Sequence, residues 1–249
     1  MLRGKWCLVT GGNRGIGMTV AVAFAKEGAS LMLVARDEPA LASAAQACTE
    51  AGAGEVVTRA ADLGDPGEID ALGEEALAKC GTVDVLVNNA AYTVPASSPL
   101  EGDPNDFDKM IAINLSAPIR LTRLLAPKMA EKRDGVIINV ASVYGHVPSA
   151  MWGVYSATKH GLKGWSHSCA ATLRPKNVKV VCVHPGCVYT DMARKMVEKD
   201  PSLAETIEGR LMAPEDVAEA CMLAFRTSAR CCPTDITLLE APPVQPHYT

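Results

Sequence analysis

The sequence predicts an α/β fold, a doubly wound parallel sheet of about seven strands with helices on both faces. Three observations carry this prediction. Short apolar runs alternate with longer segments of helical periodicity, as in repeated strand–helix–strand units. The apolar runs are continuous, which indicates strands that are buried on both faces. A glycine-rich turn follows the first apolar run and precedes the first helical segment.

The individual elements are predicted from these patterns. The expected strands cover residues 5–10, 30–35, 55–61, 83–88, 135–141, 177–183 and 235–239. Apolar residues at helical spacing predict one helix in each gap between the first four strands. Asp103 and Pro104 form a helix start, and a helical pattern continues over residues 107–132.

Length and composition favour one domain. The chain has 249 residues, of which 48% are hydrophobic and 21% are charged. A chain of this length buries well over half of its unfolded surface, so it needs no disulfide or metal in order to fold. We expect one domain over residues 1–249. Prolines cannot pair inside a sheet, so the proline-rich residues 241–249 are expected to form a surface tail.

Charge and hydropathy exclude several function classes. The formal net charge is −4, without the basic excess of a general nucleic-acid binder. No apolar run reaches the ~18 residues that a membrane helix needs. The N-terminus lacks the apolar stretch of a signal peptide. We therefore expect a cytoplasmic protein without nucleic-acid or membrane partners.

The nine cysteines are scattered and have no zinc-type spacing. Their odd number and the lack of a secretory signal favour free thiols in a reducing compartment. Cys182 and Cys187 bracket His184, which makes this segment a weak candidate for a metal site. We expect no metal.

The glycine-rich turn reads TGGNRGIG at residues 10–17. Phosphate groups bind the backbone N–H groups of a helix N-terminus, and glycine leaves room for their approach. A tight turn alone also favours glycine, but here a strand precedes and a helix follows, as dinucleotide binding requires. The TGxxxGxG spacing resembles the branch of the short-chain dehydrogenase/reductase family whose chains are about as long as this one. The resemblance implies a Rossmann fold that binds a nicotinamide dinucleotide. The implied contacts in this turn are Thr10, Gly11, Asn13, Arg14, Gly15, Ile16 and Gly17.

The end of the second strand favours NADP(H) over NAD(H). An acidic residue there would bind the NAD ribose and repel a 2′-phosphate, and NAD-preferring relatives carry it at the position of Ala35. Arg36 follows and Arg14 lies in the glycine turn, so that two guanidinium groups can hold a phosphate. The first 36 residues contain five basic residues and one acidic residue. The alternatives are an Arg36 that pairs with Asp37 or Glu38 in solvent, and an Asp37 that turns inward.

Tyr155 and Lys159 form the candidate acid/base pair. They are four residues apart, on one face of an expected helix. Carbonyl reduction needs a proton donor beside the hydride donor. A free tyrosine has a pKa of about 10, and a nearby ammonium lowers it by stabilising the phenolate. Many helices contain a tyrosine and a lysine at this spacing by chance, so the interpretation also depends on the other motifs of the sequence.

Ser142 and Asn114 complete the arrangement that the family resemblance implies. Ser142 follows the fifth strand, where a hydroxyl can hydrogen-bond a substrate oxygen; a turn serine is the alternative. On the resemblance, Tyr155 is the general acid/base, and Ser142 orients and polarises the carbonyl. Lys159 lowers the pKa of Tyr155 and holds the nicotinamide ribose. Asn114 matches the fourth catalytic position.

Pro118 supports a role for Asn114 independently of the resemblance. Proline has no N–H, so the carbonyl of Asn114, four residues earlier, loses its helical partner. We expect this carbonyl to accept from a water molecule that joins Lys159 to solvent as a proton relay. A simple proline kink is the alternative.

Further positions match cofactor contacts of the family. The 88–91 segment (NNAA) resembles the family's NNAG segment, and His184 begins the loop over the nicotinamide at a structural position where asparagine is commoner. The implied contacts are Asp62, Leu63, Asn89, Ala90, Ala91, Pro185, Gly186, Val188 and Thr190. Residues 1–100 would then mainly bind the dinucleotide, and residues 101–240 would supply catalysis and the substrate site.

The substrate site is expected to be mostly apolar and aromatic. Beside Ser142, its wall should contain Tyr92, Val94, Val143, Tyr144, His146, Trp152, Cys187, Tyr189 and Met192, with Met196 if the segment after Thr190 forms a lid. Such a wall suits a ketone, aldehyde or diketone better than a phosphorylated sugar. Ordinary core packing is the alternative for several of these residues.

The sequence thus predicts an NADP-dependent oxidoreductase of carbonyl reductase type that interconverts a ketone or aldehyde and an alcohol and forms a homodimer or homotetramer. A sensor or scaffold that binds the dinucleotide without turnover is the alternative from another class. The short chain and the glycine spacing disfavour an epimerase or dehydratase. The C-terminal DITLL segment, followed by prolines, departs from the glycine-rich end of β-ketoacyl-carrier-protein reductases and speaks against that activity.

Overall fold

The computed structural model describes residues 1–94, 100, 102–190, 193–194, 211–228 and 230–240. Within these residues, seven strands form one parallel sheet in the order β3-β2-β1-β4-β5-β6-β7. They are β1 (Trp6–Thr10), β2 (Ser30–Ala35), β3 (Val56–Ala60), β4 (Val85–Asn88), β5 (Gly135–Val140), β6 (Val178–Pro185) and β7 (Asp235–Leu238). All the expected strands are present, and their bounds lie within two residues of the predicted ones. The predicted doubly wound sheet is confirmed.

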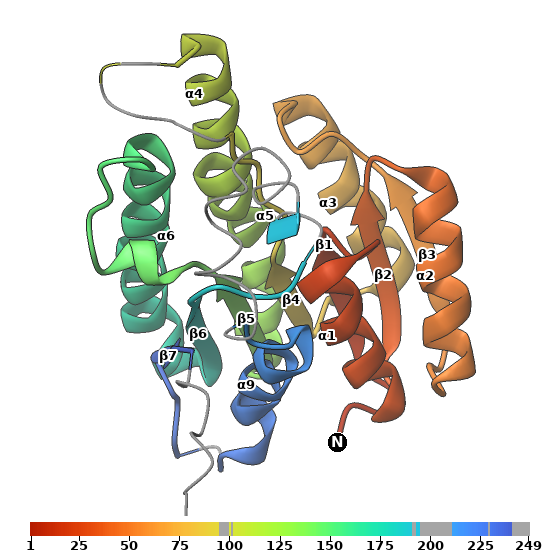
Figure 1. The fold of residues 1–249 in the computed structure, drawn as a ribbon. Helices are drawn as coiled ribbons and strands as arrows, with labels where there is room; N and C mark the ends of the chain where they lie inside the picture. Colours follow the sequence, from red (N-terminus) through yellow and green to blue (C-terminus); the bar gives the residue numbers. More distant parts are fainter. Residues whose placement is uncertain (95–99, 101, 191–192, 195–210, 229, 241–249) are drawn as a thin grey trace, which may run out of the picture.

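Helices cover both faces of this sheet (Figure 1). One face carries α1 (Gly15–Lys26), α2 (Glu38–Glu50) and α9 (Pro214–Arg226). The other face carries α3 (Pro66–Cys80), α5 (Ala117–Lys132) and α6 (Gly153–Leu173). Neighbouring residues of a strand point to opposite faces, so Cys7 and Val9 join the first core and Leu8 joins the second. This two-sided burial explains the continuous apolar runs.

The strand order reverses at β1, because the chain proceeds from β1 outward to β3 and then returns to β4 beside β1. A crevice opens at such a point, outside the carboxyl ends of the strands. The glycine turn follows β1, the 88–91 segment overlaps the end of β4, and Ser142 lies just after β5. The topology therefore brings the sequence motifs to one edge of the sheet.

Aspartate side chains cap the N-termini of three of the described helices. Asp37 Oδ1 accepts from Ala40 N at 3.0 Å at the start of α2, and Asp65 Oδ1 accepts from Gly67 N at 2.6 Å at the start of α3. Asp103 caps α4 (Pro104–Ile111) in the same way, with proline at the first helical position. The predicted helix start at residues 103–104 is confirmed.

The helical pattern expected over residues 107–132 is interrupted in the structure. It is divided into α4, the π-helical turn η1 (Ala112–Ser116) and α5. A π turn holds one extra residue, and Pro118 near its end has no N–H to donate to a standard helical bond. The turn contains Asn114, whose side chain is 1% exposed. The proline thus accompanies a change of helical register.

Two features of the second half were not predicted. α9 packs against α1, with the rings of Phe24 and Phe225 edge to face at 5.5 Å between centroids. Two short 3₁₀ segments, η2 (Val143–Gly145) and η3 (Arg174–Lys176), flank α6. Among the helices that the structure describes, none combines the length and the apolar character needed to cross a bilayer.

Candidate active site

A cleft with a volume of about 700 Å³ runs along the carboxyl edge of the sheet. It extends from Arg36 at the end of β2, past the glycine turn, to Ser142, Tyr155 and Cys187. A hollow of about 330 Å³ lies at the opposite, amino edge, beside Lys5 and Asp134, and contains none of the motif residues. The larger cleft is therefore the candidate site.

Most predicted cofactor contacts line this cleft. They are Gly11, Asn13, Arg14, Gly15, Ile16, Arg36, Asp62, Leu63, Asn89, Ala90, Ala91, Tyr155, Lys159, Pro185, Gly186, Val188 and Thr190. Residues that the sequence reasoning missed also line it: Val34, Ala61, Thr93, Ile113, Val140, Ala141, Ala193 and Leu211. Ala35 and Asp37, which were considered above in the choice of cofactor, line it too. Many of these missed residues end a strand or follow one, which is a signal that the sequence contained.

The glycine turn fits a phosphate-bearing ligand. Gly11 and Gly15 have φ values of +64° and +51°, in the left-handed region that favours glycine. α1 begins at Gly15 and has no acidic residue in its first turn, so its N-terminal N–H groups and dipole favour an anion. A Cβ on Gly17 would lie 2.1 Å from the carbonyl oxygen of Gly11. Gly17 thus permits close packing of the turn rather than contact with a ligand.

Thr10 is a structural residue, which corrects the prediction that it contacts the cofactor. It is 2% exposed and does not line the cleft. Its hydroxyl accepts from Asn89 N at 2.9 Å and Ala90 N at 3.0 Å, and donates to Val87 O at 3.1 Å. Thr10 therefore joins the end of β1 to the end of β4. Gly17 also lies outside the lining.

The end of β2 presents the cationic side chain of Arg36 to the cleft, and Asp37 and Asp62 line the cleft as well. Arg36 Nη1 lies 3.9 Å from Asp62 Oδ2, and both side chains are partly exposed. Asp37 lines the cleft, but its Oδ1 accepts from Ala40 N at the start of α2, so this oxygen is already used by the helix cap. The carboxylate nearest to Arg36 thus comes from the segment after β3, at Asp62, and not from the start of α2.

Lys159 is buried beside Tyr155 on α6. It is 2% exposed, and its ammonium donates to Val140 O at 2.9 Å. Burial lowers the pKa of Lys159 to about 8. Burial also raises the pKa of Tyr155 to about 12, against a hydrogen bond with Ser142 that acts to lower it. Desolvation thus outweighs the other influences, so that the net shift of the Tyr155 pKa is upward rather than downward. That Lys159 lowers this pKa stays a prediction.

Ser142 begins η2, and its hydroxyl accepts from Tyr144 N at 3.2 Å. Two aromatic rings flank Tyr155: those of Tyr144 and Trp152 each lie 6.4 Å from it between centroids, edge to face. The phenol and the serine hydroxyl thus share an aromatic corner of the cleft.

Asn114 lies behind the cleft rather than in its lining. Its amide accepts from Tyr92 N at 2.7 Å and donates to Tyr92 O at 2.9 Å. The same amide nitrogen lies 3.3 Å from Thr158 Oγ1 on α6. The side chain therefore holds the segment after β4 against α6, one residue from Lys159.

Of the predicted substrate residues that the structure describes, five line the cleft. Ser142, Tyr92, Tyr144, Trp152 and Cys187 line it. The Tyr92 hydroxyl donates to Asp106 at 2.6 Å, and this hydrogen bond raises the pKa of Tyr92.

Four further predicted wall residues lie outside the lining, which corrects their assignment. Tyr189 is 58% exposed and lies outside the lining, because the chain after β6 turns its side chain to the surface. Val94, Val143 and His146 also lie outside it. Met192 and Met196 fall outside the described residues.

The weak metal candidate at Cys182, His184 and Cys187 is not assembled. In the described part of the chain, the group whose ligand atoms converge near His184 contains His146 and Asp235 and neither cysteine. Cys182 is buried and Cys187 is exposed, and both carry free thiols.

Comparisons with known proteins agree with this geometry. The family model described as short chain dehydrogenase matches residues 5–201. A 3-oxoacyl-[acyl-carrier-protein] reductase of Thermotoga maritima is 34% identical over 88% of this chain and 89% of its own. A D-beta-hydroxybutyrate dehydrogenase of Cupriavidus necator is 38% identical over 80% of this chain and 76% of its own.

A solved structure agrees as well. The crystal structure of a metagenomic short-chain oxidoreductase in complex with NADP has a TM-score of 0.81 and 32% identity, covering 95% of this chain and 97% of that one. With the matched family model and the site geometry, these likenesses lead to one conclusion: this chain belongs to the short-chain dehydrogenase/reductase family of oxidoreductases.

Proposed function

We propose that this chain is an NADP-dependent carbonyl reductase, which interconverts a ketone or aldehyde and an alcohol by hydride transfer. The observation that carries the proposal is a buried Lys159 beside Tyr155, with Ser142 in the same cleft, whose lining also contains a phosphate-type glycine turn. The nicotinamide would supply or accept the hydride.

The residues of the cleft fit NADP(H). The N-terminus of α1 and the open backbone at Gly15 suit the pyrophosphate. Arg36 and Arg14 line the cleft and suit a 2′-phosphate. The Oδ1 atom of Asp37 accepts a hydrogen bond from Ala40 N at the start of α2. The NADP complex of the metagenomic relative supports this assignment.

The protein's part in the reaction is to hold and move a proton. The Ser142 hydroxyl and the Tyr155 phenol would both hydrogen-bond the substrate oxygen, which polarises the carbonyl. Tyr155 would donate its proton as the oxygen gains negative charge, and the Lys159 ammonium would stabilise the resulting phenolate. The carbonyl of Asn114, in the π turn, would bind the water that returns a proton through Lys159.

The wall of the cleft favours an apolar carbonyl substrate. Tyr144 and Trp152 present aromatic surface close to Tyr155, and Tyr92 adds a further aromatic side chain to the lining of the cleft. The names of two relatives, a 3-oxoacyl reductase and a hydroxybutyrate dehydrogenase, both refer to ketone–alcohol pairs.

We further propose one domain over residues 1–249, divided at about 100 as expected, a cytoplasmic location, and a homodimer or homotetramer. The continuous sheet supports the single domain.

The test compares the wild-type chain with Tyr155→Phe on a panel of ketones and aldehydes, followed by NADPH absorbance. The variant should bind NADPH as tightly as the wild type, while kcat falls about a thousandfold, because only the transferable proton is lost. Full activity in the variant would refute the proposal. A wild-type chain that binds NADPH but reduces no carbonyl would favour the sensor or scaffold.

A further inference from the structure

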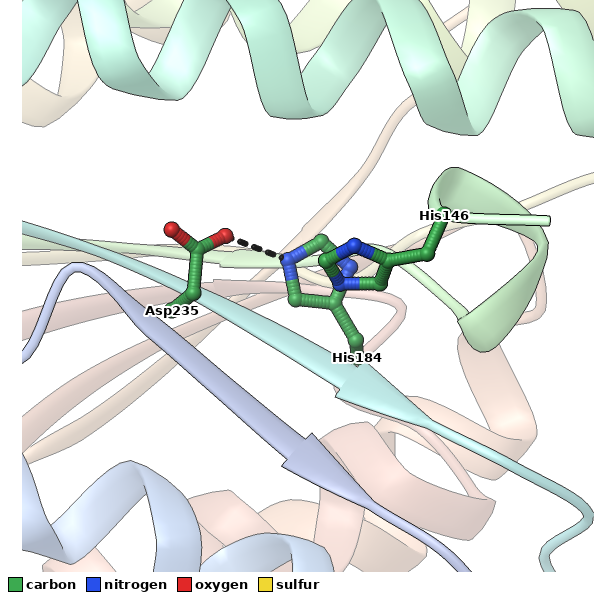
Figure 2. Close-up of side chains that lie close together, drawn as sticks. All are labelled: His146, His184 and Asp235. Carbon is green, nitrogen blue, oxygen red and sulfur yellow. Dashed lines mark hydrogen bonds and ion pairs between the residues drawn. The ribbon is translucent and has the colours of Figure 1, made fainter.

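His184 contacts the backbone of Ser142 and does not line the cleft. It belongs to β6, and its side chain is fully buried. Its Nδ1 lies 3.1 Å from the carbonyl oxygen of Ser142, and its Nε2 lies 2.8 Å from Asp235 Oδ1 on β7. Figure 2 shows the contact with Asp235 and the ring of His146 beside that of His184.

The two contacts require both ring nitrogens of His184 to donate. A carbonyl oxygen only accepts, and a carboxylate only accepts. Asp235 is held as a carboxylate: burial acts to raise its pKa, but hydrogen bonds from His184 and His167 outweigh this and lower it. His167 Nε2 lies 2.5 Å from the second oxygen, Asp235 Oδ2. With both ring nitrogens donating, His184 and Asp235 would form an imidazolium–carboxylate pair beside Ser142.

The 3₁₀ turn η2 packs closely against the ring of His184. The Ser142 carbonyl also accepts from Gly145 N at 2.8 Å, so His184 and η2 hold the same oxygen. A Cβ on Gly145 would lie 3.3 Å from His184 Nδ1 and 3.0 Å from Lys159 O. The lack of a side chain at residue 145 lets the 3₁₀ turn approach both the histidine and the lysine backbone. Ser142 is thereby fixed from β6 as well as from its own turn.

A metal ion is the competing interpretation, because ligand atoms of His146, His184 and Asp235 lie within 4.8 Å of one another. Lys163 argues against it. Its Nζ lies 2.8 Å from His146 Nδ1, so an ammonium would stand beside the cation. The pKa of His146 is lowered, by burial first and then by His184 and Lys163, which suits a neutral ring that accepts from Lys163.

We propose that His184, held by Asp235, is a positioning residue for Ser142, and that this pair couples the last strand of the sheet to the reaction. The inference rests on the proposed function, because it assigns a role in carbonyl reduction. The charged and titratable groups around His184 are Asp235 from β7, Lys163 and His167 from α6, His146 after η2, and Cys182 on β6.

Two matched variants separate the two contacts of the ring. In His184→Asn, the amide nitrogen takes the place of Nδ1 and can still donate to Ser142. In His184→Gln, the longer amide reaches the place of Nε2, toward Asp235, and leaves the Ser142 carbonyl with one donor. We expect kcat to fall by about tenfold or more in His184→Gln and by less than about threefold in His184→Asn, with the KM for NADPH unchanged in both. Equal kcat values for the two variants would overturn the proposal.

A measurement that does not depend on turnover tests the His184–Asp235 pair itself. It also separates a failure of this pair from a failure of the proposed function. In ¹⁵N NMR of the wild-type chain at neutral pH, both ring nitrogens of His184 should be protonated, and Asp235→Asn should return the ring to a single tautomer. An unprotonated Nε2 in the wild type would overturn the pair, whether or not any carbonyl is reduced. Stoichiometric Zn²⁺ binding that is lost in His146→Ala would overturn it in favour of a metal. A chain with the expected NMR spectrum but no turnover would contradict the proposed function instead.

Discussion

The Nζ atom of Lys159 lies over the ring of Tyr155, 5.5 Å from its centroid. An ammonium in this position favours the negative charge that the phenol acquires as its proton leaves. Burial acts on the two groups in opposite senses, lowering the pKa of the lysine and raising that of the tyrosine. At neutral pH both groups are protonated, which is the state that reduction requires.

The pair predicts the pH dependence of reduction. Tyr155 keeps its proton up to about pH 12, whereas Lys159 loses its charge as the pH rises through about 8. The kcat/KM for the carbonyl should therefore be constant below this pKa and fall above it. Lys159→Arg keeps the charge, so the falling limb should move up by about one pH unit or more. pH–rate profiles of the wild type and the variant check this. If kcat/KM falls at the same pH in both proteins, the fall reports the titration of another group.

Arg36 predicts the choice of cofactor. Its side chain is 58% exposed and lines the cleft beside Asp62. Arg36→Ala should lower kcat/KM for NADPH by about tenfold or more, because a charge-assisted contact with the 2′-phosphate is lost, and should change that for NADH by less than about threefold. The matched control is Arg59→Ala, which removes an ion pair between Arg59 on β3 and Glu75 on α3. An equal loss with both cofactors would contradict the NADP assignment.

The architecture was predictable because local and global signals agree. Continuous apolar runs set the strands, and the glycine turn set the edge at which the cleft opens. α9 also had its signals, Pro214 at the first position and Glu215 and Asp216 in the first turn, although it was not predicted. The π turn was indicated only as an irregularity at Pro118, since helical periodicity alone does not give its register.

Side-chain partners were the part that the sequence could not supply. Thr10 belongs to the motif, but whether its hydroxyl faces a ligand or β4 depends on strand pairing. Asp235 lies 51 residues from His184, and only the register of β6 with β7 brings them together. Whether the pKa of Tyr155 is raised or lowered depends on burial, and the four-residue spacing between Tyr155 and Lys159 does not specify burial.

Thr10 predicts a stability difference between two conservative variants. Thr10→Val keeps the shape of the side chain but leaves Asn89 N and Ala90 N without their acceptor. The free energy of unfolding should fall by about 2 kcal/mol, because two partly buried donors lose their partner. Thr10→Ser keeps the hydroxyl and should lose only about 0.8 kcal/mol with its methyl group. Urea denaturation measures both; equal losses would show that packing rather than hydrogen bonding makes the threonine necessary.

Two glycines in helices should respond to alanine in opposite directions. A Cβ on Gly17 would lie 2.1 Å from Gly11 O and 2.5 Å from Asn89 Nδ2, and the backbone oxygen can move only by opening the glycine turn. Gly17→Ala should therefore lower the free energy of unfolding by about 3 kcal/mol and weaken NADPH binding. Gly164 lies on the exposed side of α6, where a Cβ would meet nothing within 4 Å, so Gly164→Ala should raise stability by roughly 0.5–1 kcal/mol through the higher helix propensity of alanine. Thermal unfolding with and without NADPH measures both effects. A Gly17→Ala protein with wild-type stability and NADPH affinity would mean that the close packing of the turn is not needed to form the cofactor site.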